Sequence, residues 1–292
     1  MRIFLYCLHY NINIKQILLY IYITMIIFNK YKILELLTRG SYGSIYKGEN
    51  IRTCEKVAIK VETKNRHKEE EDLTLLKREA QIYLCLENSK GFSQLKWFGS
   101  DDNNTYLIMN LLGDSLQQFK TKHEKCSFIM VKEVGIQMIQ RIQFLHSKGL
   151  VHRDIKPANF LFGLNNNVHI LYLIDFGFCK KYKLANDKHI LFKSTSNIIG
   201  TMNFISLNVH KKIEPSRRDD LESIIYILLY LLGEMVWEKY KTDDIESILN
   251  LVECKQNIIY FIPDFLKQML EYVRSLNFED EPDYHFLIRL LL

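Results

Sequence analysis

The sequence contains few of the residues that break or cross-link a chain. Of its 292 residues, 4 are proline and 12 are glycine, which leaves little room for a flexible linker or a low-complexity tail. The 6 cysteines are scattered without a C-x-x-C pair, and the 9 histidines form no H-E-x-x-H pattern. We therefore expect reduced thiols, and neither a disulfide framework nor a zinc site.

Charge and hydrophobicity exclude further classes of protein. Lysine plus arginine exceeds aspartate plus glutamate by 39 − 34 = 5, an excess too small to predict a nucleic-acid partner. Hydrophobic residues make up 48% and charged residues 25%, which excludes a disordered chain and a polytopic membrane protein. At about 150 residues per domain, the length predicts two domains or one bilobal unit.

Residues 1–28 form a hydrophobic N-terminal extension. Its apolar run, Ile17–Phe28, is 12 residues long, whereas a membrane-spanning helix needs about twenty. A signal peptide fits this length, but no small-residue cleavage site follows the run. Translation from Met25 or a loosely docked extension is favoured over a membrane anchor, and the sequence alone leaves the three open.

The remaining chain divides into a strand-rich part and a helix-rich part. Short runs of β-branched and aromatic residues predict strands over 31–37, 44–48, 56–61 and 106–109. Helical periodicity predicts helices over 73–86, 128–146, 219–232, 265–276 and 284–291. This order predicts an α+β, bilobal fold, with a small β-rich lobe (29–112), a larger helical lobe (113–292) and a cleft between them.

The first lobe carries two features that suit phosphate binding. Gly40 and Gly43 lie between two predicted strands, where glycine lets backbone N–H groups approach a phosphate, although a hairpin turn explains them equally well. Lys60 closes an apolar strand fifteen residues past Ile45. Burying its ammonium would be costly without an anion, and Glu79 on the following helix is a candidate partner.

The second lobe carries the decisive segment. Asp154, Lys156 and Asn159 lie within six residues, between apolar stretches. At 175 − 154 = 21 positions further on, Asp175 follows another apolar run and precedes Phe-Gly. An aspartate at a strand end followed by glycine is well placed to hold a divalent cation. Chance does not account for all these motifs in one order.

Together these motifs resemble the signature set of eukaryotic protein kinases. The resemblance implies ATP and Mg²⁺, with Asp154 as catalytic base, Lys156 at the γ-phosphate, and Asn159 with Asp175 on the metal. The residues that it places around ATP are Leu37, Thr38, Gly40, Ser41, Gly43, Ile45, Lys60, Glu79, Met109 and Leu111.

Other segments resemble the casein kinase 1 family of Ser/Thr protein kinases. Ser206-Leu207-Asn208 stands where most kinases have A-P-E, and the runs at 216–223, 274–276 and 281–284 are similar to that family. The resemblance covers about residues 29–292. It implies protein substrates with Ser or Thr in an acidic context, a monomeric enzyme in the cytoplasm or nucleus, and activity without phosphorylation of the activation segment.

The resemblance also assigns supporting roles. Arg153 is expected to hold an anion within the activation segment, residues 175–206. Asp220 is expected to fix the backbone of the catalytic loop from the central helix, and His152 is expected to be a packed structural residue.

Several positions depart from the family pattern, including Thr38, Asn203 with its neighbours Met202, Phe204 and Ile205, and Ile225. Thr38 replaces the first glycine of G-x-G-x-x-G. Asn203 stands where the family has an arginine that helps hold a phosphate on a primed substrate, and a neutral amide cannot supply that charge-assisted fork. Lys241 is left as one basic partner.

Two other functions fit the sequence less well. A pseudokinase scaffold would bind nucleotide and signal by conformation, but such proteins usually lack one of the key groups, and Lys60, Asp154, Asn159 and Asp175 are all present. A small-molecule kinase of similar fold is disfavoured by the segment 217–223.

Overall fold

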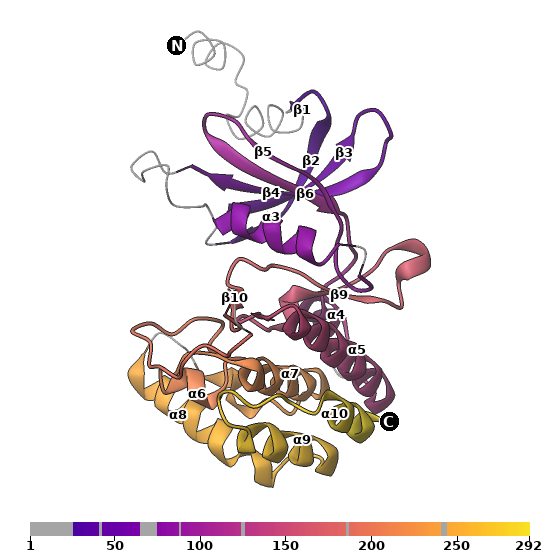
Figure 1. Cartoon of the computed structure of the whole chain (residues 1–292). Helices are drawn as coiled ribbons and strands as arrows, with labels where there is room; N and C mark the ends of the chain where they lie inside the picture. Colours follow the sequence, from indigo (N-terminus) through magenta and orange to yellow (C-terminus); the bar gives the residue numbers. More distant parts are fainter. Residues whose placement is uncertain are drawn as a thin grey trace. The chain divides into compact units, whose positions relative to one another are not determined.

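The computed structural model describes residues 26–40, 43–64, 75–87, 89–123, 126–184, 187–240 and 244–292. The chain forms two compact units. The first comprises the described residues up to Glu87 together with Ser93–Leu112, and the second comprises Asn88–Phe92 with Gly113–Leu292. The first is built around a curled sheet and the second around helices, so the predicted α+β class is confirmed (Figure 1).

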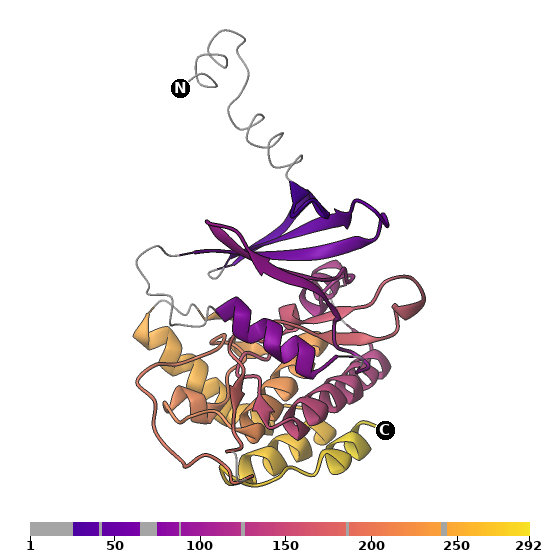
Figure 2. The same cartoon turned by 45° about the horizontal axis from the view of Figure 1, so that its top comes forward.

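A six-stranded antiparallel sheet forms the first unit. Its strands run in the order β1-β2-β3-β4-β6-β5. They span Ile26–Ile27 (β1), Tyr31–Gly40 (β2), Gly43–Asn50 (β3), Lys56–Thr63 (β4), Leu95–Ser100 (β5) and Asn104–Asn110 (β6). Helix α3 (Leu75–Cys85) lies against one face of this sheet (Figures 1 and 2).

Alternation along the strands sorts the side chains onto two faces. One face carries a buried apolar cluster of Ile27, Tyr31, Ile33, Tyr46, Val57, Ile59, Tyr106 and Ile108. The opposite face carries Ile45 and Lys60, which pair directly across β3 and β4. Helix α3 covers this second face, because its Glu79 contacts Lys60.

The sheet begins earlier than the sequence suggests. Ile27 in β1 pairs with Tyr31 in β2, and the ring of Phe28 lies 4.3 Å from that of Trp97. The sheet therefore starts three residues before Asn29, while residues 1–25 lie outside the described part of the chain. Among the described residues, no helix combines the length and apolarity needed to cross a membrane.

Helices make up most of the second unit. They span Leu116–Lys122 (α4), Phe128–Ser147 (α5), Leu207–His210 (α6), Arg217–Leu232 (α7), Ile245–Asn257 (α8), Asp264–Ser275 (α9) and Tyr284–Leu291 (α10). Two short antiparallel pairs join β7 (Leu150–Val151) to β10 (Lys180–Lys181), and β8 (Phe160–Phe162) to β9 (Leu171–Leu173). The sequence did not predict α4, α6, α8 or β5.

Helix α7 is the centre of this unit. All its side chains from Leu221 to Leu229 are buried, and α5 and α9 both pack on it (Figure 1). The helix ends at Gly233, whose φ of 77° is the left-handed conformation that favours glycine after a helix. The described cysteines are free thiols, and Cys7 lies outside the described residues.

Candidate active site

Lys60 and Glu79 form a buried ion pair within the first unit. Lys60 Nζ donates a hydrogen bond to Glu79 Oε2 at 2.7 Å, and the two side chains are 13% and 2% exposed. Lys60 pairs with Ile45 on β3 and with Leu107 on β6, so these three side chains share one face of the sheet. Helix α3 lies against this face, which brings Glu79 to Lys60. The structure therefore brings together the two residues that the sequence singled out as partners.

The glycine-rich turn lies at the end of the β2–β3 hairpin. Gly40 pairs with Gly43, and Ser41 between them lies outside the described residues. Gly43 has a φ of 138°, and a Cβ atom there would lie 2.2 Å from the carbonyl oxygen of Val61. Only glycine fits this position. On β2, Leu37 and Thr38 are both exposed.

Met109 lies near the end of β6, and Leu111 follows that strand shortly before the first unit ends at Leu112. Met109 pairs with Ala58, two residues before Lys60 on β4, so its side chain shares the face that carries Lys60. It is 6% exposed. Leu111 follows β6 directly and is half-buried.

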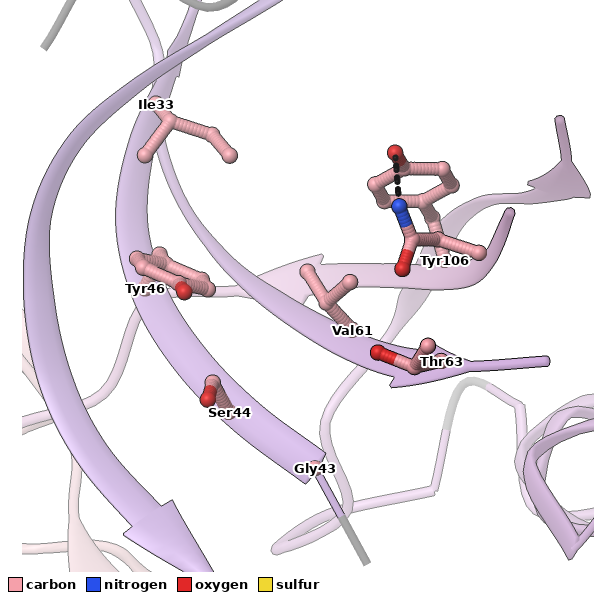
Figure 3. Close-up of a pocket in the computed structure, with 8 residues that line it drawn as sticks. Ile33, Gly43, Ser44, Tyr46, Val61, Thr63 and Tyr106 are labelled. Carbon is pink, nitrogen blue, oxygen red and sulfur yellow. Dashed lines mark hydrogen bonds between the residues drawn. The ribbon is translucent and has the colours of Figure 1, made fainter. Parts of the chain in front are cut away.

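A cavity of about 120 Å³ opens on the other face of the same sheet. Figure 3 shows Tyr46, Val61 and Tyr106 around it, with Ile33 and Thr63 at its margins. Tyr46 and Val61 directly follow Ile45 and Lys60 in the sequence, so their side chains point to the opposite face. Of the groups that the sequence assigned to phosphate binding, Gly43 lines this cavity, whereas Lys60 lies on the opposite face of the sheet.

In the second unit, the carboxylate of Asp154 is buried and bonded at both oxygens. Lys156 Nζ donates to Oδ2 at 2.6 Å, and Thr201 Oγ1 donates to Oδ1 at 2.9 Å. Asp154 is 3% exposed. The contact with Thr201 was not predicted, because nothing in the local sequence of either residue indicates it.

Asn159 and the segment that carries Asp175 are joined through the backbone. Asn159 ends a short 3₁₀ turn, η1 (Pro157–Asn159), and its Nδ2 donates to the Asp154 carbonyl at 2.9 Å. The amide of Ile174 donates to the Asn159 carbonyl at 3.0 Å, which places the next residue, Asp175, beside Asn159. Asp175 has a φ of 66°, a conformation that aspartate tolerates better than most residues.

These two residues fit a magnesium ion. With Nδ2 of Asn159 engaged by the backbone, its Oδ1 is the atom that can coordinate a cation. Magnesium takes oxygen ligands, and in phosphoryl-transfer sites it uses one or two protein groups together with phosphates and water. Within the described residues, no three His, Cys, Asp or Glu side chains cluster as an all-protein metal site.

Asp220 holds the backbone on which Asp154 is mounted. It accepts hydrogen bonds from the amides of His152 at 2.7 Å and Arg153 at 2.9 Å, and it bonds His146 Nε2 at 2.9 Å. Burial by itself raises the pKa of Asp220, but the hydrogen bonds and charges of His146 and His152 together outweigh burial, and the pKa is lowered. The carboxylate stays ionised, as its predicted role requires.

His152 is packed rather than exposed, which confirms the prediction. It is fully buried. Its Nδ1 accepts the amide N–H of Asp154 at 3.3 Å, and its Nε2 lies 3.2 Å from the carbonyl oxygen of Ile174. Both ring nitrogens are therefore engaged in joining the catalytic loop to the strand before Asp175.

Arg153 contacts an anion, but the anion lies outside the segment expected. Its Nη1 lies 3.3 Å from Oε1 of Glu214, a residue beyond 175–206. Lys180 lies 3.0 Å from the same oxygen, and Lys193 lies 3.9 Å from Oε2. Glu214 is 2% exposed, so one buried carboxylate neutralises cations from the catalytic loop and from the segment after Asp175.

Glu214→Gln is expected to lower the free energy of unfolding by about 3 kcal/mol, because Arg153 and Lys180 would lose their buried counter-charge. Lys193→Gln is the matched control, since that lysine is 58% exposed. It should change stability by less than about 1 kcal/mol. Denaturant unfolding of the three proteins makes the comparison. Equal stabilities of the two variants would show that the buried carboxylate has no special role.

Comparison with known families agrees with this geometry. The chain matches the protein kinase domain over residues 31–279, which is most of its length, and it belongs to the protein kinase family. Protein kinase domains are phosphotransferases that bind ATP and act on protein substrates. The matched range includes both the Lys60–Glu79 pair and the cluster around Asp154.

Proposed function

We propose that the chain is a Ser/Thr protein kinase of the casein kinase 1 type, which transfers the γ-phosphoryl group of ATP to hydroxyl groups of proteins. The proposal is supported above all by Asp154, a buried carboxylate held between Lys156 and Thr201 and joined through Asn159 to the segment of Asp175. The casein kinase 1 assignment is supported by the sequence segments at 206–208 and 216–223.

The residues supply distinct parts of the chemistry. Each carboxylate oxygen has two lone pairs, so Asp154 can accept a substrate hydroxyl while keeping its bonds to Lys156 and Thr201. It would orient that hydroxyl and take its proton. Lys156 would offset negative charge on the transferred group, and Lys60 would contact the other phosphates. Asn159 and Asp175 would hold Mg²⁺, which withdraws charge from the phosphates when bound.

The test is transfer of labelled phosphate from Mg·ATP to dephosphorylated casein, an acidic protein, followed by identification of the phosphorylated amino acid. Phosphoserine and phosphothreonine are expected. An Asp175→Ala protein purified in parallel controls for contaminating kinases. Nucleotide binding without transfer would instead identify a pseudokinase, and phosphotyrosine alone would refute the Ser/Thr assignment.

Substrate choice should differ from the family at Asn203. Its carbonyl accepts a hydrogen bond from Trp237 Nε1 at 3.0 Å, and among the described residues its buried Oδ1 has no partner. Lys241, the other expected basic group, lies outside the described residues. A neutral amide makes no charge-assisted bond to a phosphate. We expect a weak preference for phosphate-primed peptides.

Asn203→Arg should restore part of that preference. One charge-assisted hydrogen bond contributes about 1.5–3 kcal/mol, so the ratio of kcat/KM for primed over unprimed peptide should rise about ten- to a hundredfold. Matched peptides that differ only in an upstream phosphoserine provide the measurement. A strong preference in the unmodified protein, unchanged by the substitution, would contradict this expectation.

A further inference from the structure

Lys255 on α8 is a fully buried lysine. Its side chain is 0% exposed, and among the described residues no carboxylate forms an ion pair with it. Its Nζ donates to the carbonyl oxygens of Met202 at 2.9 Å and Ile205 at 2.7 Å, and lies 3.1 Å from His210 Nε2. An ammonium group has three donors, and these three acceptors match them.

Aromatic rings complete the surroundings of this ammonium. Nζ lies 4.7 Å from the ring centre of Tyr226 and 5.7 Å from that of Trp237. Such rings attract a cation more strongly where water is excluded. Burial, together with the neighbouring Lys255, lowers the pKa of His210 to about 3, so its neutral ring can accept a hydrogen bond.

Three carbonyl groups of one short segment, residues 201–205, are held by these side chains. Lys255 binds the carbonyls of Met202 and Ile205, and Trp237 Nε1 donates to the carbonyl of Asn203. An apolar side chain would fill the same space without the cost of burying a charge. Core stability therefore does not explain a lysine at this position. A lysine can, however, hold the backbone of residues 201–205 in one conformation through its hydrogen bonds.

The same segment lies against the carboxylate of Asp154. Thr201 Oγ1 donates to Asp154 Oδ1 at 2.9 Å. At Gly200, a Cβ atom would lie 2.8 Å from the carbonyl oxygen of Arg153 and 2.7 Å from Ile205 Cγ2. A peptide that presents a hydroxyl group to Asp154 must therefore pass beside residues 200–205.

We propose that Lys255 is a positioning residue for the peptide substrate, acting through the carbonyl groups of residues 201–205. The inference rests on the proposed protein kinase activity. Lys255 contacts neither Asp154 nor Lys60. Its loss should consequently change peptide binding more than ATP binding or the chemical step.

Lys255→Met tests this proposal, because methionine is similar in length and unbranched but donates no hydrogen bond. The KM for an acidic serine-containing peptide is expected to rise at least about tenfold, the effect of losing one charge-assisted hydrogen bond. The KM for ATP, and ATP hydrolysis without peptide, should change less than about twofold. Lys148→Met is the control, since Lys148 is exposed at the end of α5.

Hydrogen exchange supplies a readout that does not depend on activity. The amides of Phe204 and Ile205 both donate to the Thr201 carbonyl, at 2.8 and 3.1 Å. Their exchange should accelerate at least about tenfold in Lys255→Met. If the variant does not fold, Trp237→Phe removes the donor to Asn203 and leaves a smaller ring beside Lys255, and it should show both changes to a smaller degree.

The outcomes separate the two proposals. An unmodified protein that transfers no phosphate refutes the proposed function, while exchange at 204–205 still tests the role of Lys255. A folded Lys255→Met protein with unchanged peptide KM and unchanged exchange overturns the positioning role. Equal increases in the KM for peptide and the KM for ATP would also overturn it, because loss of a merely structural lysine would produce that result.

Discussion

Replacing Asp175 with alanine is expected to lower phosphoryl transfer on the order of a thousandfold while leaving the fold intact. Asp175 is the carboxylate beside Asn159, whose Nδ2 is already engaged by the Asp154 carbonyl. Without it, one amide oxygen is left to hold the cation, and a neutral oxygen binds Mg²⁺ weakly. Asp175 is half-buried and belongs to neither a helix nor a strand, so little apolar packing is lost.

The backbone at this position calls for a second variant. Asp175 has a φ of 66°, which costs alanine roughly 1–2 kcal/mol but which asparagine tolerates. Asp175→Asn therefore keeps the backbone and removes the charge. Initial rates with Mg·ATP, together with thermal unfolding, should show both variants inactive and folded. If Asp175→Asn were active, the loss of activity in Asp175→Ala would come from backbone strain. If both variants were fully active, Asp175 would not be a ligand of the metal ion.

The residues proposed to be catalytic could be identified from the sequence because each lies in a short segment with its own pattern. Asp154, Lys156 and Asn159 fall within six residues, and Asp175 follows a buried strand. The ion pair of Lys60 with Glu79 was also predictable, since a lysine at the end of an apolar strand needs an anion.

The supporting contacts were not predictable, because they join distant segments. Thr201 reaches Asp154 across 47 positions, and Lys255 reaches Ile205 across 50. The anion held by Arg153 was expected within the segment 175–206, whereas it is Glu214, which lies beyond that segment because the chain returns to Arg153 after α6. No residue type at these positions signals its partner in the linear sequence.

Helix α8 shows why periodicity can fail. Its buried side carries Lys255 beside Leu251, while Ile245 and Leu249 are 79% and 63% exposed. Part of the apolar pattern therefore lies on the exposed side of the helix, whereas Lys255 lies on the buried side. Strand β5 was missed for a simpler reason, since its side chains are half-buried on both faces and show no alternation.

Lys60→Arg is expected to reduce phosphoryl transfer on the order of a hundredfold, even though the positive charge is kept. Lys60 Nζ lies 2.7 Å from Glu79 Oε2, with the two side chains 13% and 2% exposed. A guanidinium group is larger and planar, and its charge is spread over several nitrogens. In this buried space it would displace Glu79 or turn away from it, and the point charge expected at the phosphates would move.

Lys47→Arg is the matched control for this substitution. Lys47 lies on the neighbouring strand β3, pairs with Glu35 at 2.9 Å, and is 35% exposed, so a larger head group can extend into solvent. Its ion pair should tolerate arginine with little change in rate. Steady-state kinetics at varied ATP concentration should show a loss of activity in Lys60→Arg and little change in Lys47→Arg. Equal and near-normal turnover in both variants would mean that the ammonium of Lys60 takes no part in binding the nucleotide, and that its pairing with Glu79 only stabilises the sheet against α3.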